Sequence, residues 1–278
     1  MFNNFAIIFV LSSAVLYGTL AFKFDRLYVH NTMMSRSYPK PNEYPYMAAI
    51  LANGAFHCNG VIISNQIVLT TAACVLDKIN ELQHVTIRTG SNHPWRGGQI
   101  HNVEKYYVHS VNITEIEPGV MHLIGAFKLS SRVNINSNQQ TIKIGKLPEE
   151  IYEEQPTFSF FRGDWPAALS GFGKAQFETD TSLKRAEVQI ARIPNCKKSL
   201  AFEGLSYYDH NICAYHNDLR IGNDSSVLVY KNSLIGLAAY SRIDVKTTSG
   251  LPHPRVSGSV FIYVHKVNDF VDRIVQNP

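Results

Sequence analysis

The sequence of 278 residues lacks the features that mark several large classes of protein. It contains no run of basic residues and no nucleic-acid-binding motif, and its formal charge is only +4. Nucleic acid is therefore not an expected partner, although this charge permits weak attraction to acidic surfaces or polysaccharides. Internal repeats and low-complexity tracts are also absent. What remains is a globular composition, 45% hydrophobic and 17% charged, sufficient for one large all-β domain or two smaller ones.

Long hydrophobic runs are scarce, and the one present lies at Phe5–Ala21, ending in small residues around Thr19-Leu20-Ala21. This pattern predicts a signal peptide over residues 1–21. A transmembrane anchor is the alternative. The run is short for a membrane span and the charges that follow it, Lys23, Asp25 and Arg26, are of mixed sign. We therefore expect a secreted, extracellular protein with no membrane attachment once the signal is removed.

Cysteine is also sparse, with four residues and no C-x-x-C pair, so we expect neither a metal site nor a metal cofactor. An even number of cysteines in a secreted chain predicts two disulfides. The residues alone permit three pairings among Cys58, Cys74, Cys196 and Cys213. Pairing between neighbours in the sequence would place one small loop in each half of the chain.

A secreted protein can be N-glycosylated, and the sequence contains two sequons for this modification, Asn112-Ile-Thr114 and Asn223-Asp-Ser225. Asn112 is the better candidate because it lies in a polar, loop-like stretch. A glycan on Asn223 would lie close to the candidate site discussed below.

Short apolar runs alternating with polar turns dominate the chain from Tyr46 onward, which predicts an all-β sandwich or barrel. Residues 22–43 lack this periodicity and are expected to form an extended N-terminal arm. A low-pattern stretch from about Pro148 to Pro166 is the best linker between two strand-rich halves. Lys231-Asn232 lies between two strand-like runs and predicts a hairpin turn.

One helix is predicted at the C-terminus, where four apolar side chains recur at helical spacing. These residues are Val267, Phe270, Val271 and Ile274. We expect the helix to dock on the body of the protein through simple packing.

Several blocks of sequence resemble the domain of the chymotrypsin- and trypsin-like serine proteases. Tyr44–Ile50 (YPYMAAI), Phe56–Ile63 (FHCNGVII) and Val68–Cys74 (VLTTAAC) are similar to the family patterns F-P-Y-x-V-x-I, F-x-C-x-G-x-L-I and V-L-T-A-A-H-C. Ser170–Gly173 (SGFG) and Gly222–Val227 (GNDSSV) resemble the later patterns S-G-W-G and G-D-S-G-G-P. Blocks in this order, with this spacing, are a specific signal.

The resemblance covers roughly residues 33 to 275 and implies a fold of two packed six-stranded antiparallel β-barrels with a C-terminal helix. We expect the domain at 44–275, with the first barrel at about 44–147, the second at about 166–264 and the helix at about 266–276. The resemblance also implies local disulfides, Cys58–Cys74 and Cys196–Cys213.

The catalytic positions of the family hold residues that cannot perform its chemistry. A serine protease needs a hydroxyl nucleophile, an imidazole base and a carboxylate that orients the imidazole. The resemblance places Ala73 at the base, Leu123 at the carboxylate and Asp224 at the nucleophile. A carboxylate at Asp224 would also oppose the negative charge that develops on the oxyanion. We therefore expect no catalytic residue, and no serine-protease activity.

An atypical active site built on Ser225 is the alternative for an enzyme. Ser225 follows the nucleophile position by one residue, so its side chain should point in a different direction. His57 and His122 are adjacent to motif positions, but we expect both to have structural roles.

The activation mechanism of the family is also missing. Its new amino terminus should fall at Met33–Arg36, but Thr32 precedes this segment in place of a basic residue. The aspartate that would pair with the amino terminus is Asn223. Because both members of this buried ion pair are absent, neither leaves an unpaired charge behind.

The substrate cleft implied by the family is altered as well. Asp218 falls where trypsin-like members hold the acidic base of the specificity pocket, but a solvated loop aspartate is the preferred interpretation. Gly222 keeps an oxyanion-hole glycine, whereas Asn223 and Ser225 differ from the family pattern. Tyr240 falls at the aromatic wall of the pocket.

These positions favour a secreted, non-enzymatic serine protease homologue that binds an extracellular protein partner, such as a protease or a protease substrate. An atypical endopeptidase is one alternative. A glycan- or microbial-surface-binding protein is another, for which the positive charge and tyrosine-rich loops give weak support.

Overall fold

The computed structural model describes residues 37–113, 119–154, 165–172, 181–202, 204–216, 225–246 and 252–278. All of these residues belong to one compact unit, residues 35–278. In the described part of the chain, no helix combines the length and the apolar character needed to cross a membrane.

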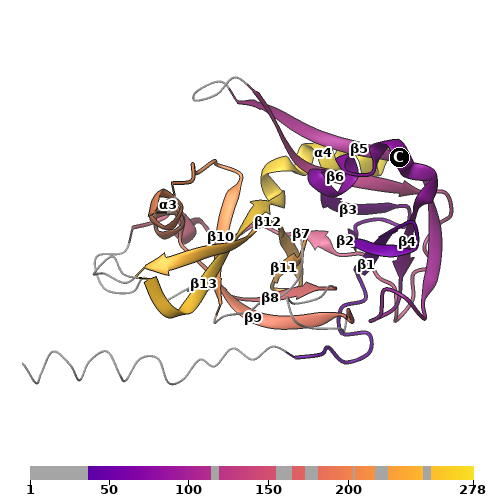
Figure 1. The fold of residues 1–278 in the computed structure, drawn as a ribbon, viewed down its shortest axis with the longest axis horizontal. Coiled ribbons are helices and arrows are strands. Elements are labelled where there is room, and N and C mark those ends of the chain that lie inside the picture. The colour runs from indigo at the N-terminus through magenta and orange to yellow at the C-terminus, as the bar shows by residue number, and fades with distance from the viewer. Residues whose placement is uncertain are drawn as a thin grey trace, which may run out of the picture. The chain divides into compact units, whose positions relative to one another are not determined.

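The first half of the domain is a closed antiparallel barrel with the strand order β1-β2-β3-β6-β5-β4 (Figure 1). The strands are β1 (Met47–Ala52), β2 (Ala55–Ile62), β3 (Ile67–Thr71), β4 (Val85–Thr89), β5 (Gln99–Ile113) and β6 (Gly119–Leu129). β1 pairs with both β2 and β4, which closes the sheet on itself. All six residues of β1, MAAILA, are buried, whereas β4, VTIRT, alternates between buried and half-buried positions.

The second half is another six-stranded antiparallel barrel, in the order β11-β8-β9-β10-β13-β12, closed by pairing of β11 with β12. Its strands are β8 (Trp165–Gly171), β9 (Lys184–Ile190), β10 (Asn211–His216), β11 (Val227–Tyr230), β12 (Ser233–Lys246) and β13 (Pro252–Tyr263). The short strand β7 (Lys143–Ile144) adds to it in parallel with β12. The predicted pair of six-stranded barrels is confirmed, and β7, placed in the first barrel from the sequence, joins the sheet of the second.

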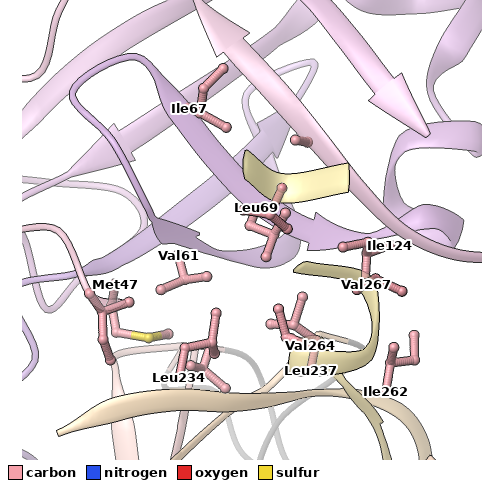
Figure 2. Close-up of a cluster of buried hydrophobic side chains, with 14 of the residues drawn as sticks. Met47, Val61, Ile67, Leu69, Ile124, Leu234, Leu237, Ile262, Val264 and Val267 are labelled. Atoms are coloured by element: carbon pink, nitrogen blue, oxygen red, sulfur yellow. The ribbon is translucent and has the colours of Figure 1, made fainter. Parts of the chain in front are cut away.

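An apolar layer joins the two barrels, and it is the largest cluster of buried side chains in the described chain. Figure 2 shows Val61, Leu69 and Ile124 of the first barrel facing Leu234 and Leu237 of the second. Because interiors of this kind are densely packed, the relative position of the barrels is fixed by side-chain shape. The polar groups described below lie beside this layer.

Helices are short and few among the described residues: α2 (Ala72–Leu76), α3 (Ile193–Phe202) and α4 (Asn268–Gln276). Three short 3₁₀ segments accompany them: η1 (Ile79–His84), which is kinked at Glu81, η2 (Glu149–Tyr152) and η3 (Val264–Val267). α4 confirms the predicted C-terminal helix and lies beside β5 (Figure 1). The ring centroids of Phe270 on α4 and His109 on β5 are 5.2 Å apart. α3 was not predicted, because its apolar residues show little helical periodicity.

Two tight turns connect neighbouring antiparallel strands through residues with positive φ angles. Asn53 and Gly54, between β1 and β2, have φ values of 51° and 74°. Lys231 and Asn232, between β11 and β12, have φ values of 47° and 58°. Two successive positive φ angles match the twist of the paired strands, so the predicted hairpin at Lys231-Asn232 is confirmed.

The described end of the N-terminal arm is tied to the second barrel. Ser37 forms a two-way backbone bridge with Arg185 on β9, with N···O distances of 3.0 and 2.9 Å. The guanidinium of Arg185 also donates to the Ser37 hydroxyl at 2.9 Å and pairs with the Glu43 carboxylate. The last residues of the arm are therefore part of the folded body.

Candidate functional site

A buried polar connection crosses from the first barrel to the second at the end of β8. The side chain of Asn59 on β2 is fully buried. Its amide oxygen accepts from the Phe172 backbone N–H at 2.6 Å, and its amide nitrogen donates to the Phe172 carbonyl at 3.3 Å. The Asn59 carbonyl accepts from the Thr70 hydroxyl at 2.7 Å. One asparagine thus satisfies both backbone groups of a residue in the other barrel, and sequence analysis did not single it out.

Ser225 lies beside this connection, two residues before the start of β11, and it is 0% exposed. Its hydroxyl oxygen lies 2.8 Å from the Thr71 hydroxyl, 3.2 Å from the Thr70 hydroxyl and 2.8 Å from the Cys74 sulfur. Its backbone N–H donates to the carbonyl of Ala238 on β12 at 3.1 Å. The hydroxyl is therefore held inside the protein, between the two barrels.

The backbone of Ser225 has φ = 70°, the left-handed region that glycine adopts most readily. A non-glycine residue in this conformation costs on the order of 1 kcal/mol. The family pattern places a glycine here, as the sequence resemblance indicated. The hydroxyl contacts offset the backbone strain, and this explains why a serine can occupy the position.

Helix α2 follows β3 and contains Ala73, which the sequence resemblance places at the position of the family's base. Cys74 in this helix forms the disulfide with Cys58, and Cys196 pairs with Cys213, so both predicted pairings are confirmed. Ala73 precedes Cys74 and is exposed. The side chain at this exposed position is a methyl group, which cannot accept a proton.

Leu123, which the sequence resemblance places at the position of the family's orienting carboxylate, lies on β6. Its side chain is 3% exposed and belongs to the apolar layer between the barrels, next to Ile124. A leucine here packs and cannot form a hydrogen bond. Its burial shows that the surroundings of this position are apolar.

His57 lies close to α2 but is committed to other partners. Its Nε2 atom is 3.0 Å from the Cys74 carbonyl, which fixes a proton on that nitrogen, and 3.7 Å from the Asp77 carboxylate. The Ser225 hydroxyl contacts a different atom of Cys74, its sulfur, at 2.8 Å. Each side chain is thus held by a different atom of Cys74, in agreement with the structural role expected for His57.

A histidine–serine pair that sequence analysis missed lies elsewhere, between His101 on β5 and Ser131, which follows β6. His101 Nδ1 is 3.1 Å from the Ser131 hydroxyl, and His101 Nε2 is 3.1 Å from the Thr89 hydroxyl. The ring is 1% exposed, and burial lowers the pKa of His101. Because the second nitrogen bonds a neutral hydroxyl and not a carboxylate, the imidazolium required of a general base would not be stabilised. The arrangement is that of a satisfied core histidine.

Several predicted site positions lie outside the described residues: Asp218, Gly222, Asn223 and Asp224. The side chains of Tyr240 and His122 are also outside the described part of the structure. Roles at these positions remain predictions. The residues described contain no group of three or more His, Cys, Asp or Glu side chains arranged to hold a metal ion.

The expectation that Asn112 lies in a loop-like stretch was wrong. Asn112 is the penultimate residue of β5 and pairs with Val120 of β6. The long β5–β6 hairpin extends its strand pairing to Ile113 and Gly119, so a locally polar sequence is held extended by its partner strand. Glycosylation of Asn112 stays a prediction.

Comparison with known proteins identifies relatives across almost the whole domain. The family model described as Trypsin matches residues 34–271. Hypodermin-A of Hypoderma lineatum is 26% identical over 206 residues, which are 72% of this chain and 74% of that protein.

Solved structures similar to this chain include neuropsin, a serine protease expressed in mouse brain. Its TM-score is 0.63 at 18% identity, and the match covers 87% of this chain and 99% of neuropsin. The scabies mite inactivated protease paralogue S-I1 matches with the same TM-score and coverage at 20% identity. A protein named as a protease and one named as inactivated thus match equally well. The fold alone therefore does not distinguish activity from its loss, and the residues of the site must.

Proposed function

The chain belongs to the trypsin family of serine proteases, and we propose that it is a secreted member that does not cleave peptide bonds and acts as a binding or regulatory protein. The observation behind this proposal is the pair of side chains at Ala73 and Leu123. One is an exposed methyl group and the other a buried leucine. Neither can accept a proton or orient an imidazole, which are the two tasks of those positions in the family.

The loss of these groups is expected to abolish activity and not merely to slow it. In serine proteases, losing the nucleophile or the base alone reduces the rate about a millionfold, and further losses add little. The sequence supports a third loss, since Asp224 stands at the nucleophile position. A negative charge there would disfavour the oxyanion of an attacked carbonyl.

The alternative, an atypical endopeptidase that uses Ser225, is disfavoured by the contacts of that side chain. Its oxygen is fully buried and lies among the hydroxyls of Thr70 and Thr71 and the sulfur of Cys74. A nucleophile must reach its substrate and have a base within hydrogen-bond distance. The nearby His57 bonds a backbone carbonyl through Nε2.

Secretion is supported by residues 1–21, which have the composition of a signal peptide, and by two disulfides. In this setting the expected partner is extracellular, either a protease or a substrate of one. Affinity purification of the secreted protein, followed by identification of bound proteins, would name it.

The absence of activity is tested with a fluorophosphonate probe, which labels activated serines covalently. We expect no labelling of the purified secreted protein under conditions in which an active trypsin is labelled fully. Ser225→Ala is the matched control variant. Labelling of the native chain that disappears in Ser225→Ala would support the atypical endopeptidase and refute the proposal.

A further inference from the structure

The loop between β4 and β5 and the described end of the N-terminal arm both carry exposed aromatic and cationic side chains. The described chain has seven large hydrophobic side chains that are notably exposed, and three lie on these segments or directly beside them. They are Tyr38, 64% exposed, Trp95, 47% exposed, and Ile100, 42% exposed. Single exposed apolar residues are ordinary, but three on neighbouring segments single this region out as a candidate interaction surface.

The loop that holds Trp95 is rigidly built. The Arg88 guanidinium donates to the Pro94 carbonyl at 2.9 Å and also to the carbonyls of Trp95 and Gly97. Ser91 donates its hydroxyl to the Arg96 carbonyl at 2.6 Å. An arginine that binds three carbonyls of one loop fixes its backbone, so little conformational entropy is lost when the loop binds a ligand.

Trp95 itself is fixed although almost half of it is exposed. Its indole N–H donates to the Thr181 hydroxyl at 2.6 Å. The indole is thus held at one edge while much of its surface remains open to solvent. Such a preorganised aromatic surface suits stacking on a flat apolar face of a ligand.

The arm is tied to the same loop. The side-chain amide of Asn92 donates to the carbonyls of Pro39 and Lys40, at 3.4 and 3.5 Å. The Asn92 carbonyl accepts from the backbone N–H of Leu183 at 2.7 Å. The segment that holds Tyr38 therefore lies against the loop that holds Trp95.

The charge of these segments is mainly positive. Residues 37–43 and 88–98 contain three cationic side chains, Lys40, Arg88 and Arg96, and a single carboxylate, Glu43. That carboxylate forms an ion pair with Arg185, whose guanidinium also lies 3.8 Å from the Glu187 carboxylate. Arg96 is exposed and contacts His93 at 3.2 Å through one amino group, which leaves further N–H donors of its guanidinium for a ligand.

We propose that Trp95, Arg96, Lys40 and Tyr38 form a binding site for an anionic polysaccharide. The indole would stack on the C–H face of a sugar ring, while the guanidinium and ammonium groups would pair with sulfate or carboxylate groups on the chain. A fixed indole with almost half of its surface open to solvent suits the C–H face of a sugar ring, a face that the carboxylate side chain of an acidic peptide does not offer. This inference rests on the proposed function only in that the protein acts by binding.

The test is retention of the full secreted chain on immobilised heparin, a sulfated polysaccharide, against neutral dextran, together with the dissociation constant in solution. We expect binding to heparin that weakens as salt is raised, and none to dextran. Trp95→Ala and Arg96→Ala should each weaken binding roughly ten- to a hundredfold, the effect of losing one charged or well-packed contact. Trp95→Phe, which keeps a ring, should retain most of the affinity and serves if Trp95→Ala does not fold.

Tyr152→Ala and Lys198→Ala are the matched controls, since they remove an exposed aromatic and an exposed cation on other elements. Both should leave binding within about twofold of the native chain, the range of a weak surface charge effect. No retention at low salt would overturn the proposal, as would equal losses in the controls. Displacement by polyglutamate that is insensitive to Trp95→Ala would assign the surface to an acidic protein instead. Peptide hydrolysis is a separate readout, so a failure here leaves the non-enzymatic function standing.

Discussion

Replacing Ser225 by alanine should lower the free energy of unfolding by about 2 kcal/mol, while replacing it by glycine should cost only about half as much. Both variants lose the hydroxyl that bonds Thr71 and the Cys74 sulfur, and a broken buried hydrogen bond costs about 1–3 kcal/mol. Only glycine relieves the left-handed backbone at φ = 70°, which returns about 1 kcal/mol. The order of stability should therefore be native, then Ser225→Gly, then Ser225→Ala.

Thermal unfolding of the oxidised, secreted protein measures this difference. For a domain of this size 1 kcal/mol corresponds to about 2–4 °C, so Ser225→Ala should lose about 4–8 °C. Ser137→Ala is the control, because Ser137 is exposed and its hydroxyl bonds only Asn138 in the described structure. An unchanged melting temperature in Ser225→Ala would show that the hydroxyl network is not formed. A glycine variant less stable than the alanine variant would contradict the left-handed conformation.

Two further predictions concern side chains that are fully or partly buried. Leu123→Asp should lower the free energy of unfolding by more than about 3 kcal/mol, because it places a carboxylate in an apolar layer. Leu123→Met keeps the site apolar and should cost less than about 1.5 kcal/mol. Chemical denaturation measures both variants, and equal stability of the two would refute the packing role of Leu123. Stability should fall as pH drops below about 6.5, because burial lowers the pKa values of His101, His109 and His210, so the unfolded chain binds more protons. The difference between the melting temperatures at pH 7.5 and pH 5.5 measures this loss of stability. The difference should be smaller in His101→Gln. A native chain that becomes more stable on acidification would contradict the prediction.

The fold was predictable because several independent signals in the sequence agree. Alternating burial in β4 and continuous burial in β1 are visible as sequence patterns, and the two-residue turn at Lys231-Asn232 is a local feature. The C-terminal helix shows four apolar residues at helical spacing. Such elements carry their own periodicity, so no knowledge of distant partners is needed to predict them.

What the sequence did not show depends on contacts between segments far apart in the chain. Asn59 and Phe172 are 113 residues apart, and nothing local to either indicates that one satisfies the other. The pairing of Asn112 with Val120 overrides a polar, loop-like sequence because the partner strand continues the ladder. In the same way, the fixed position of Trp95 depends on a hydroxyl at Thr181.

The family resemblance predicted which residues stand at the candidate site, and the structure adds the exposure and contacts of Ala73, Leu123 and Ser225. Ala73 was expected to lack a base, and the structure adds that its methyl group is exposed. Leu123 was expected only to pack, and it lies in the layer that joins the barrels. Ser225 was expected to point away from the nucleophile position, and it lies buried against Thr71.

Cleavage of peptide bonds is the most direct test of the account. The secreted protein would be incubated with a complex peptide library and new termini would be identified by mass spectrometry, with an active trypsin as the positive control. The account predicts no cleavage above that seen without protein. New termini that appear with the native chain and vanish in Ser225→Ala or Asp224→Asn would contradict it.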